Sequence, residues 1–159
     1  MSVLETRVKA VNRANAYVNE IAPQLLAVFA KFVGQKIIKS DGHLTGKVQK
    51  CVDGLNLTNT NKLAVYFEKT RPFVRFTVKT CENYPDGRGG IAYYHQTGIN
   101  IGWYSDADPS VLTGLYEFES RKTDYDAKEI EALRTAYKNA LKAVNEAENA
   151  LSPFGVCDR

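Results

Sequence analysis

The chain has 159 residues and a formal net charge of +3, and 44% of its residues are hydrophobic, which is typical of one soluble globular domain over residues 1–159. The sequence lacks both an apolar run of about 18 residues and a basic, apolar leader, which predicts a cytoplasmic protein with no membrane partner. Cys51, Cys81 and Cys157 are odd in number and far apart, so free thiols are expected and a disulfide framework or zinc site is not.

The first predicted element is a long helix near residues 2–33. Ser2 and Glu5 match the S-x-x-E capping box with which many helices begin, and apolar residues then recur every three or four positions. Pro23 interrupts this pattern, so the sequence predicts either a kink there or a second helix that begins at Pro23. Gly34 is the expected C-cap.

Strands are predicted after this helix. A short pair at residues 35–39 and 43–48 is joined by a turn through residues 40–42, and residues 62–70 and 72–80 form a β-hairpin rich in β-branched and aromatic residues. The predicted strand at residues 72–80 has two different faces. One face is apolar and contains Val74, Phe76 and Val78, and the opposite face contains Phe73, Arg75, Thr77 and Lys79. Such alternation is typical of an antiparallel sheet with one solvated side.

A second hairpin is predicted from residues 91–95 and 99–105. The three residues 96–98 form its loop, because Gly98 suits the left-handed region that such loops require. A further strand is expected within residues 110–120, after the Asp-Pro turn that precedes it.

The aromatic residues of this second hairpin are predicted to divide between the two faces of the sheet. Alternation along residues 99–104 places Trp103 in the core and Tyr104 on the solvated face. One of Tyr93 and Tyr94 joins Tyr104, because neighbouring strand residues point to opposite faces. A sheet face with tyrosines and cations suits either stacking with single-stranded nucleic acid or anchoring contacts with a protein.

The last predicted element is a helix over residues 126–151, which begins with the box Asp126 and Glu129. Its apolar stripe predicts that Leu133, Tyr137, Leu141 and Val144 are buried and that Lys128, Lys138, Lys142 and Glu146 are exposed. The predicted fold class is therefore α+β, an antiparallel β-meander of four to six strands packed with long N-terminal and C-terminal helices.

Residues 86–90 contain three glycines around Arg88 and allow two interpretations. Asp86-Gly87 and Gly89-Gly90 suit a turn that joins two strands, which explains the glycines by backbone geometry. Alternatively, Arg88 and the adjacent backbone N–H groups bind an anion. The segment does not match a phosphate-binding P-loop, since neither Lys-Ser/Thr nor a helix follows.

Catalytic and cofactor-binding patterns are absent from the sequence. The two histidines, His43 and His95, belong to no nucleophile motif and have no metal-ligand spacing from a cysteine. The sequence therefore predicts a non-catalytic protein with no cofactor and no metal.

The positive charge of the chain is concentrated in its central segment, and the predicted function depends on this segment. Residues 31–90 contain eleven Lys or Arg and five Asp or Glu, a local charge of +6. The predicted binding patch comprises Arg75, Lys79, Arg88 and Tyr104, and the expected partner is a protein that this chain modulates or inhibits, as a virus- or mobile-element-encoded effector would. The alternative is nucleic-acid binding through the basic 62–88 strand and loop region.

Overall fold

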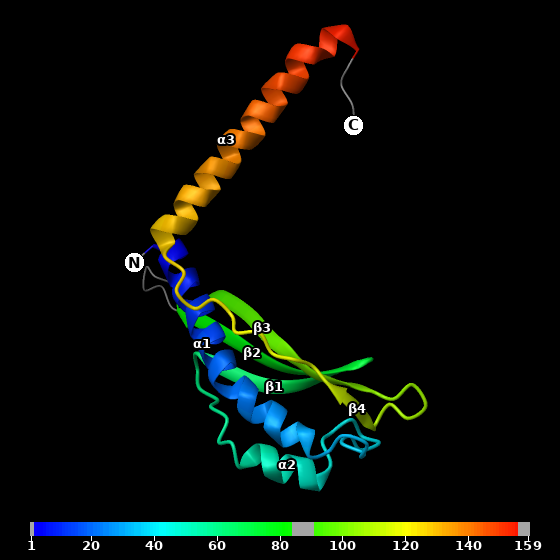
Figure 1. Cartoon of the computed structure of the whole chain (residues 1–159). Coiled ribbons are helices and arrows are strands. Elements are labelled where there is room, and N and C mark those ends of the chain that lie inside the picture. Colours follow the sequence, from blue (N-terminus) through cyan, green and yellow to red (C-terminus); the bar gives the residue numbers. More distant parts are fainter. Residues whose placement is uncertain (1, 84–90, 156–159) are drawn as a thin grey trace. The chain divides into compact units, whose positions relative to one another are not determined.

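The computed structural model describes residues 2–83 and 91–155 of the chain. Four strands form one antiparallel sheet in the order β1-β2-β3-β4 (Figure 1). This confirms the α+β class, with a strand number at the low end of the predicted range. The elements in chain order are α1 (Val3–Ala30), α2 (Gly46–Asp53), β1 (Leu63–Thr70), β2 (Phe73–Asn83), β3 (Ile91–Tyr104), β4 (Leu112–Leu115), α3 (Ala127–Leu151) and the 3₁₀ turn η1 (Ser152–Phe154).

Two compact units make up the chain. Met1–Asp124 contains α1, α2 and the sheet, and Tyr125–Arg159 contains α3 and η1. Organisation of residues 1–159 as a single globular domain stays a prediction. In the described part of the chain, every helix is too short or too polar to cross a membrane.

The predicted capping box starts α1. The backbone N–H of Glu5 donates to Ser2 Oγ at 3.1 Å, and the backbone N–H of Ser2 donates to Glu5 Oε2 at 2.7 Å. The helix continues through Pro23, so the alternative of a second helix that begins there is wrong. Gly34 lies in the left-handed region (φ 83°) three residues beyond the observed C-cap, Lys31, and is therefore not the C-cap itself.

The hydrophobic core lies between α1 and one face of the sheet (Figure 1). Phe76 of β2 is fully buried at its centre, and the centroid of its ring is 5.6 Å from that of Phe67 and 6.5 Å from that of Tyr17. The core side chains come from α1, α2 and alternate positions of the strands, including Ala14, Val18, Ile21, Leu25, Phe29, Val48, Val52, Val74, Phe76, Val78, Ile99 and Ile101. The predicted apolar face of β2 is therefore the buried one.

The predicted hairpin of β1 and β2 is confirmed, with Thr70 paired to Phe73 across the turn. The second predicted hairpin is wrong, because β3 is one continuous strand and its residues 96–98 pair with β2. Gly98 serves a close approach between strands instead of a loop. A Cβ at Gly98 would overlap the carbonyl oxygen of Phe76 and lie 3.1 Å from the Cα of Thr77.

A β-bulge reverses the predicted faces at the end of β3. The register of β3 against β2 shifts between Val74 and Arg75, which leaves Ile101 as one additional residue on β3. Every later side chain consequently changes face. Trp103 points away from α1 and is 38% exposed, whereas Tyr104 belongs to the core and is 4% exposed. The predicted core position of Trp103 and solvated position of Tyr104 are both wrong.

The short strand pair predicted before the sheet is only partly present. Ile38 and Leu44 form an isolated antiparallel bridge around a turn that contains Gly42 in the left-handed region (φ 88°). Beyond Leu44 the predicted strand is wrong, because residues 46–53 form α2. Val48 and Val52 are four residues apart and both buried, which is the spacing of a helix face.

The C-terminal helix α3 forms close to its predicted bounds. Asp126 is its N-cap, and the carboxylate accepts hydrogen bonds from the backbone N–H groups of Lys128 (2.8 Å) and Glu129 (3.3 Å). The predicted exposure of its charged face, Lys128, Lys138, Lys142 and Glu146, is confirmed.

The predicted burial of the α3 stripe is wrong. Leu133, Tyr137, Leu141 and Val144 are 48–69% exposed, and α3 has no buried residue among those that the structure describes. An apolar stripe indicates which side of a helix is able to pack against another element. The side chains of the stripe become buried only where such an element lies against them. The compact unit that contains α3 otherwise holds only η1 among its described elements.

Candidate functional site

The sheet face opposite α1, which we call the outer face, carries most of the polar and aromatic side chains of the strands. Directly paired residues of antiparallel strands point to the same face, so the register identifies its members. They include Tyr66 and Glu68 of β1, Phe73, Arg75, Thr77 and Lys79 of β2, and Tyr94, Gln96, Asn100 and Trp103 of β3.

Lys79 lies between two tyrosines from the neighbouring strands. Its Nζ is 4.8 Å from the ring centroid of Tyr66 and 5.2 Å from that of Tyr94, within the range of cation–π attraction. Contact with Tyr66, and secondarily with Tyr94, raises the pKa of Lys79, so its ammonium group remains charged at neutral pH. Tyr94 is 55% exposed, which leaves much of its ring open to a partner.

Arg75 occupies the middle of the outer face among polar neighbours. Its Nη1 donates to Asn100 Oδ1 at 3.2 Å. Glu68 lies directly across from Arg75 on β1, and Glu68 Oε2 accepts a hydrogen bond from Thr77 Oγ1 at 2.9 Å. A carboxylate therefore lies close to the cations, which gives this face a mixed charge.

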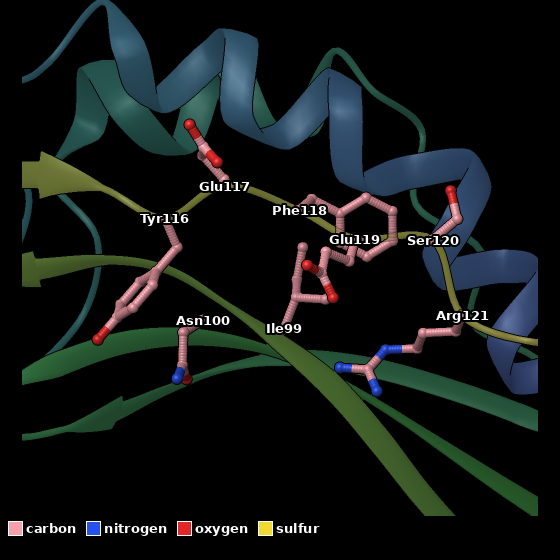
Figure 2. A pocket seen from close by; sticks show the side chains of 8 residues that line it. All are labelled: Ile99, Asn100, Tyr116, Glu117, Phe118, Glu119, Ser120 and Arg121. Carbon is pink, nitrogen blue, oxygen red and sulfur yellow. The ribbon is translucent and has the colours of Figure 1, made fainter.

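A pocket of about 510 Å³ opens beside the outer face, between residues 99–100 of β3 and the segment 116–121 that follows β4 (Figure 2). The Arg121 side chain reaches from this segment toward the strands, and its Nη2 donates to the carbonyl oxygen of Gly98. Its Nε is buried and has no hydrogen-bond partner among the described residues. Burial, and secondarily the nearby charge of Arg75, lowers the pKa of Arg121.

Helix α1 fixes the position of Arg121. The side chain of Asn19 donates from Nδ2 to the carbonyl oxygen of Arg121 (2.9 Å), and its Oδ1 accepts from the Arg121 backbone N–H (2.7 Å). Asn15 Nδ2 donates to the carbonyl oxygen of Lys122 at 2.7 Å. At the other end of the segment, the Tyr116 N–H donates to the Ile101 carbonyl oxygen at 2.9 Å. The pocket forms between these two attachments.

Three aromatic rings cluster at the end of the outer face that lies nearest β4. The Trp103 ring meets that of Tyr116 edge-on (5.2 Å, 78°), and Tyr116 meets Phe73 likewise (5.4 Å, 63°). Gly114 pairs with Trp103, and a Cβ at Gly114 would overlap the indole ring. The glycine thus allows the indole to lie against β4.

The structure describes three of the four predicted site residues, and these three lie on two different faces of the sheet. Arg75 and Lys79 lie on the outer face as predicted. Tyr104 lies in the core, because the bulge reverses its face. Arg88 and the glycines around it lie outside the described residues, so its predicted role, whether in a turn or in anion binding, stays a prediction.

Burial of Tyr104 leads to a stability prediction. Its hydroxyl is buried with no hydrogen-bond partner among the described residues, and burial raises the pKa of Tyr104 to about 12. We expect Tyr104→Phe to retain the stability of the wild-type chain at neutral pH or to add about 1 kcal/mol, because an unpaired buried hydroxyl is unfavourable. The raised pKa means that stability is complete below pH 10 and is lost as pH rises toward 12, by about 1 kcal/mol near pH 11.

Urea unfolding near neutral pH and near pH 11 checks this expectation, with Tyr137→Phe, an exposed tyrosine, as the control. The alkaline loss should be smaller in Tyr104→Phe than in either the wild type or the control. A loss above about 1 kcal/mol at neutral pH would show instead that the hydroxyl makes a favourable hydrogen bond.

The sequence did not predict that Tyr66, Trp103, Tyr116 and Arg121 belong to this surface. Tyr66 was detectable, since a two-residue turn in the β1–β2 hairpin places it opposite Thr77. Trp103 changes face through the bulge. Tyr116 and Arg121 are positioned by contacts with distant parts of the chain, for which the sequence has no local signal.

The two histidines lie apart from this surface, in the part of the chain that the structure describes. His43 lies in an exposed turn, and burial lowers the pKa of the half-buried His95. Among the described residues, no three His, Cys, Asp or Glu side chains come close enough to hold a metal ion. Comparison of the chain with family models, curated proteins and solved structures gave no match.

Proposed function

We propose that this chain is a non-catalytic interaction protein that binds a protein partner through the outer face of its sheet. The observation that carries this proposal is the combination of an exposed Tyr94 and a half-exposed Trp103 with the cations Lys79 and Arg75 on one rigid face. Tyrosine, tryptophan and arginine dominate the binding energy of many protein interfaces, because they combine a large contact area with groups that form hydrogen bonds.

The pocket beside Arg121 adds charged groups of both signs to this surface. Two guanidinium groups lie near one another there, and the Arg121 Nε lacks a hydrogen-bond partner among the described residues. Glu117 and Glu119 line the same pocket, so a partner that meets this position encounters both cationic and anionic groups.

Mixed charge favours a protein over nucleic acid. Glu68 lies opposite Arg75 in the middle of the face, and Glu117 and Glu119 line the adjoining pocket. A nucleic-acid surface would instead bring phosphates against these three carboxylates, where like charges repel. Nucleic-acid binding through the basic 62–88 region remains the alternative that the experiment below must separate.

The chain would act by occupying the partner's surface, as a modulator or inhibitor does. We further propose that it does so in a reducing cytoplasm, with which the free, half-buried thiols of Cys51 and Cys81 agree.

The test begins with capture of a partner from lysate by the tagged chain, with and without nuclease, followed by titration of the purified partner. We expect one stoichiometric protein that survives nuclease treatment. Tyr94→Ala and Lys79→Ala should each weaken its binding by more than about 1 kcal/mol, which is about fivefold. Lys31→Ala removes the same charge from an exposed position at the end of α1 and should leave affinity unchanged.

The same variants are then titrated against a labelled single-stranded oligonucleotide. If the oligonucleotide binds and removal of Arg75 and Lys79 together reduces the salt slope by about two units, the nucleic-acid alternative is correct. If the protein partner binds Tyr94→Ala and Lys79→Ala as tightly as it binds the wild type, the outer face is not the binding surface.

A further inference from the structure

Most apolar residues of α3 follow a heptad, and Leu141, Ala136, Ala143 and Ala150 lie beside its seam. Seven of them recur in alternating steps of three and four, at what are positions a and d of a coiled coil: Ile130, Leu133, Tyr137, Ala140, Val144, Ala147 and Leu151. An average spacing of 3.5 residues keeps such a seam on one side of a helix that supercoils around another helix.

The opposite side of α3 is polar. Between Ile130 and Leu151, the positions b, c and f are polar apart from Ala132: they are Glu131, Thr135, Lys138, Asn139, Lys142, Asn145, Glu146 and Asn149. This polar side extends along the helix from Glu131 to Asn149. This distribution is typical of a helix with one apolar seam and one solvated back.

The seam has little cover in its own compact unit. Leu133 is 61% exposed, Tyr137 69% and Val144 54%. Large apolar side chains that share one exposed line on a helix are typical of an interaction surface.

We infer that two copies of this chain associate through α3 as a parallel, in-register, two-stranded coiled coil. Charge complementarity identifies the second copy as the occupant. In a parallel pair, position g of one helix faces position e of the next heptad on the other, which sets Glu129 against Arg134 of the second copy. Two-fold symmetry makes this contact twice.

The residues in the seam agree with this geometry. The β-branched Ile130 and Val144 occupy two of the four a positions, and Leu133 occupies one of the three d positions; β-branched residues at a and leucine at d favour parallel dimers. In an antiparallel pair, g faces g and e faces e, so Glu129 would oppose an alanine and lose its contact with Arg134.

The first experiment measures the mass of the full chain by sedimentation velocity between about 1 and 100 µM, because a dimer's mass depends on protein concentration. We expect a dimer of twice 17.7 kDa that dissociates on dilution. Leu133→Asp should give the monomer throughout, and Thr135→Asp, which adds the same charge at position f, should retain the dimer. Fluorescence of Trp103, the single tryptophan, verifies that the sheet unit is folded in both variants.

Two further variants test the orientation. Arg134→Glu should weaken the dimer at least about fivefold through repulsion by Glu129 of the second copy, and the exchange Glu129→Arg with Arg134→Glu should restore it. Ile130→Cys, with the native cysteines replaced by serine, should cross-link rapidly in a parallel dimer. In an antiparallel one, two such residues lie about 25 Å apart along the seam.

The possible contrary results are distinct. A monomer at every concentration, or a dimer that Leu133→Asp and Thr135→Asp affect equally, overturns the interface. A dimer in which Ile130→Cys does not cross-link and the charge exchange restores nothing overturns the parallel orientation.

Discussion

Truncation of Phe76 to alanine is expected to lower the free energy of unfolding by about 3–5 kcal/mol. Phe76 is fully buried, and its ring lies between those of Phe67 and Tyr17, so strand β1 and helix α1 both lose contacts when it is removed. The surrounding strands and helix cannot close the resulting cavity without losing their own packing. Native stability is only about 5–15 kcal/mol, so this change approaches global unfolding.

Urea unfolding of the full chain, followed by the fluorescence of Trp103, measures this effect on the sheet unit. Phe154→Ala is the matched control, because Phe154 is 78% exposed and the same truncation there should change stability by less than about 0.5 kcal/mol. If Phe76→Ala does not fold, Phe76→Leu provides a milder step, with an expected loss of about 1 kcal/mol. A loss below about 1 kcal/mol for Phe76→Ala would place the core elsewhere.

The second large effect is expected from Gly98→Ala, which should destabilise the fold by about 1–3 kcal/mol. A methyl group at this position would overlap the carbonyl oxygen of Phe76 and lie 3.1 Å from the Cα of Thr77. These are backbone atoms of the adjacent strand β2, which cannot move aside as a flexible side chain would. Relief therefore requires β2 and β3 to separate, and it also displaces the Gly98 carbonyl that accepts from Arg121.

Gly46→Ala is the control for this substitution. Gly46 lies in the first turn of α2, where an added Cβ meets no atom within 4 Å, so alanine should be neutral or slightly stabilising. Thermal unfolding of the two variants should differ by several degrees, with Gly98→Ala the lower. Equal melting temperatures would show that the strands can accommodate the methyl group.

Binding should also distinguish the two substitutions. Gly98 lies beneath Arg75 on the outer face and touches the pocket of Arg121 through its carbonyl oxygen. If Gly98→Ala folds, it should bind the proposed protein partner with lower affinity than the wild type does. Gly46→Ala should bind that partner as tightly as the wild type. Titration of the two variants against that partner measures the difference.

Local patterns in the sequence determined the two long helices and the first hairpin. The capping box at Ser2 and the N-cap at Asp126 both form as predicted, because each satisfies backbone N–H groups only a few residues away. The hairpin of β1 and β2 also follows from the sequence, since period-two alternation and a tight turn act within twenty residues. Arg75 and Lys79 consequently lie on the face opposite the core, as the alternation indicated.

Predictions failed where pairing between strands decided the outcome. Gly98 lies inside strand β3, where Phe76 and Thr77 of β2 approach its backbone closely. A glycine permits this contact, but a glycine in a sequence does not indicate whether it serves a loop or a close approach between strands. The bulge at Ile101 turned Trp103 outward and Tyr104 inward. A single additional residue on one strand reverses every later side chain, and its position depends on the partner strand as much as on its own sequence.

In the candidate site and in the C-terminal helix, too, local features followed from the sequence, whereas contacts between residues far apart in the chain did not. The sequence by itself determined that α3 has an apolar seam, because helical periodicity is local, but only the tertiary structure decided that Leu133 and Tyr137 stay exposed. Arg121 reaches Gly98 because Asn19, 102 residues earlier in the chain, holds its backbone. Local propensity fixes helices, caps and alternation, whereas faces, pockets and burial arise from contacts between residues that are distant in the chain.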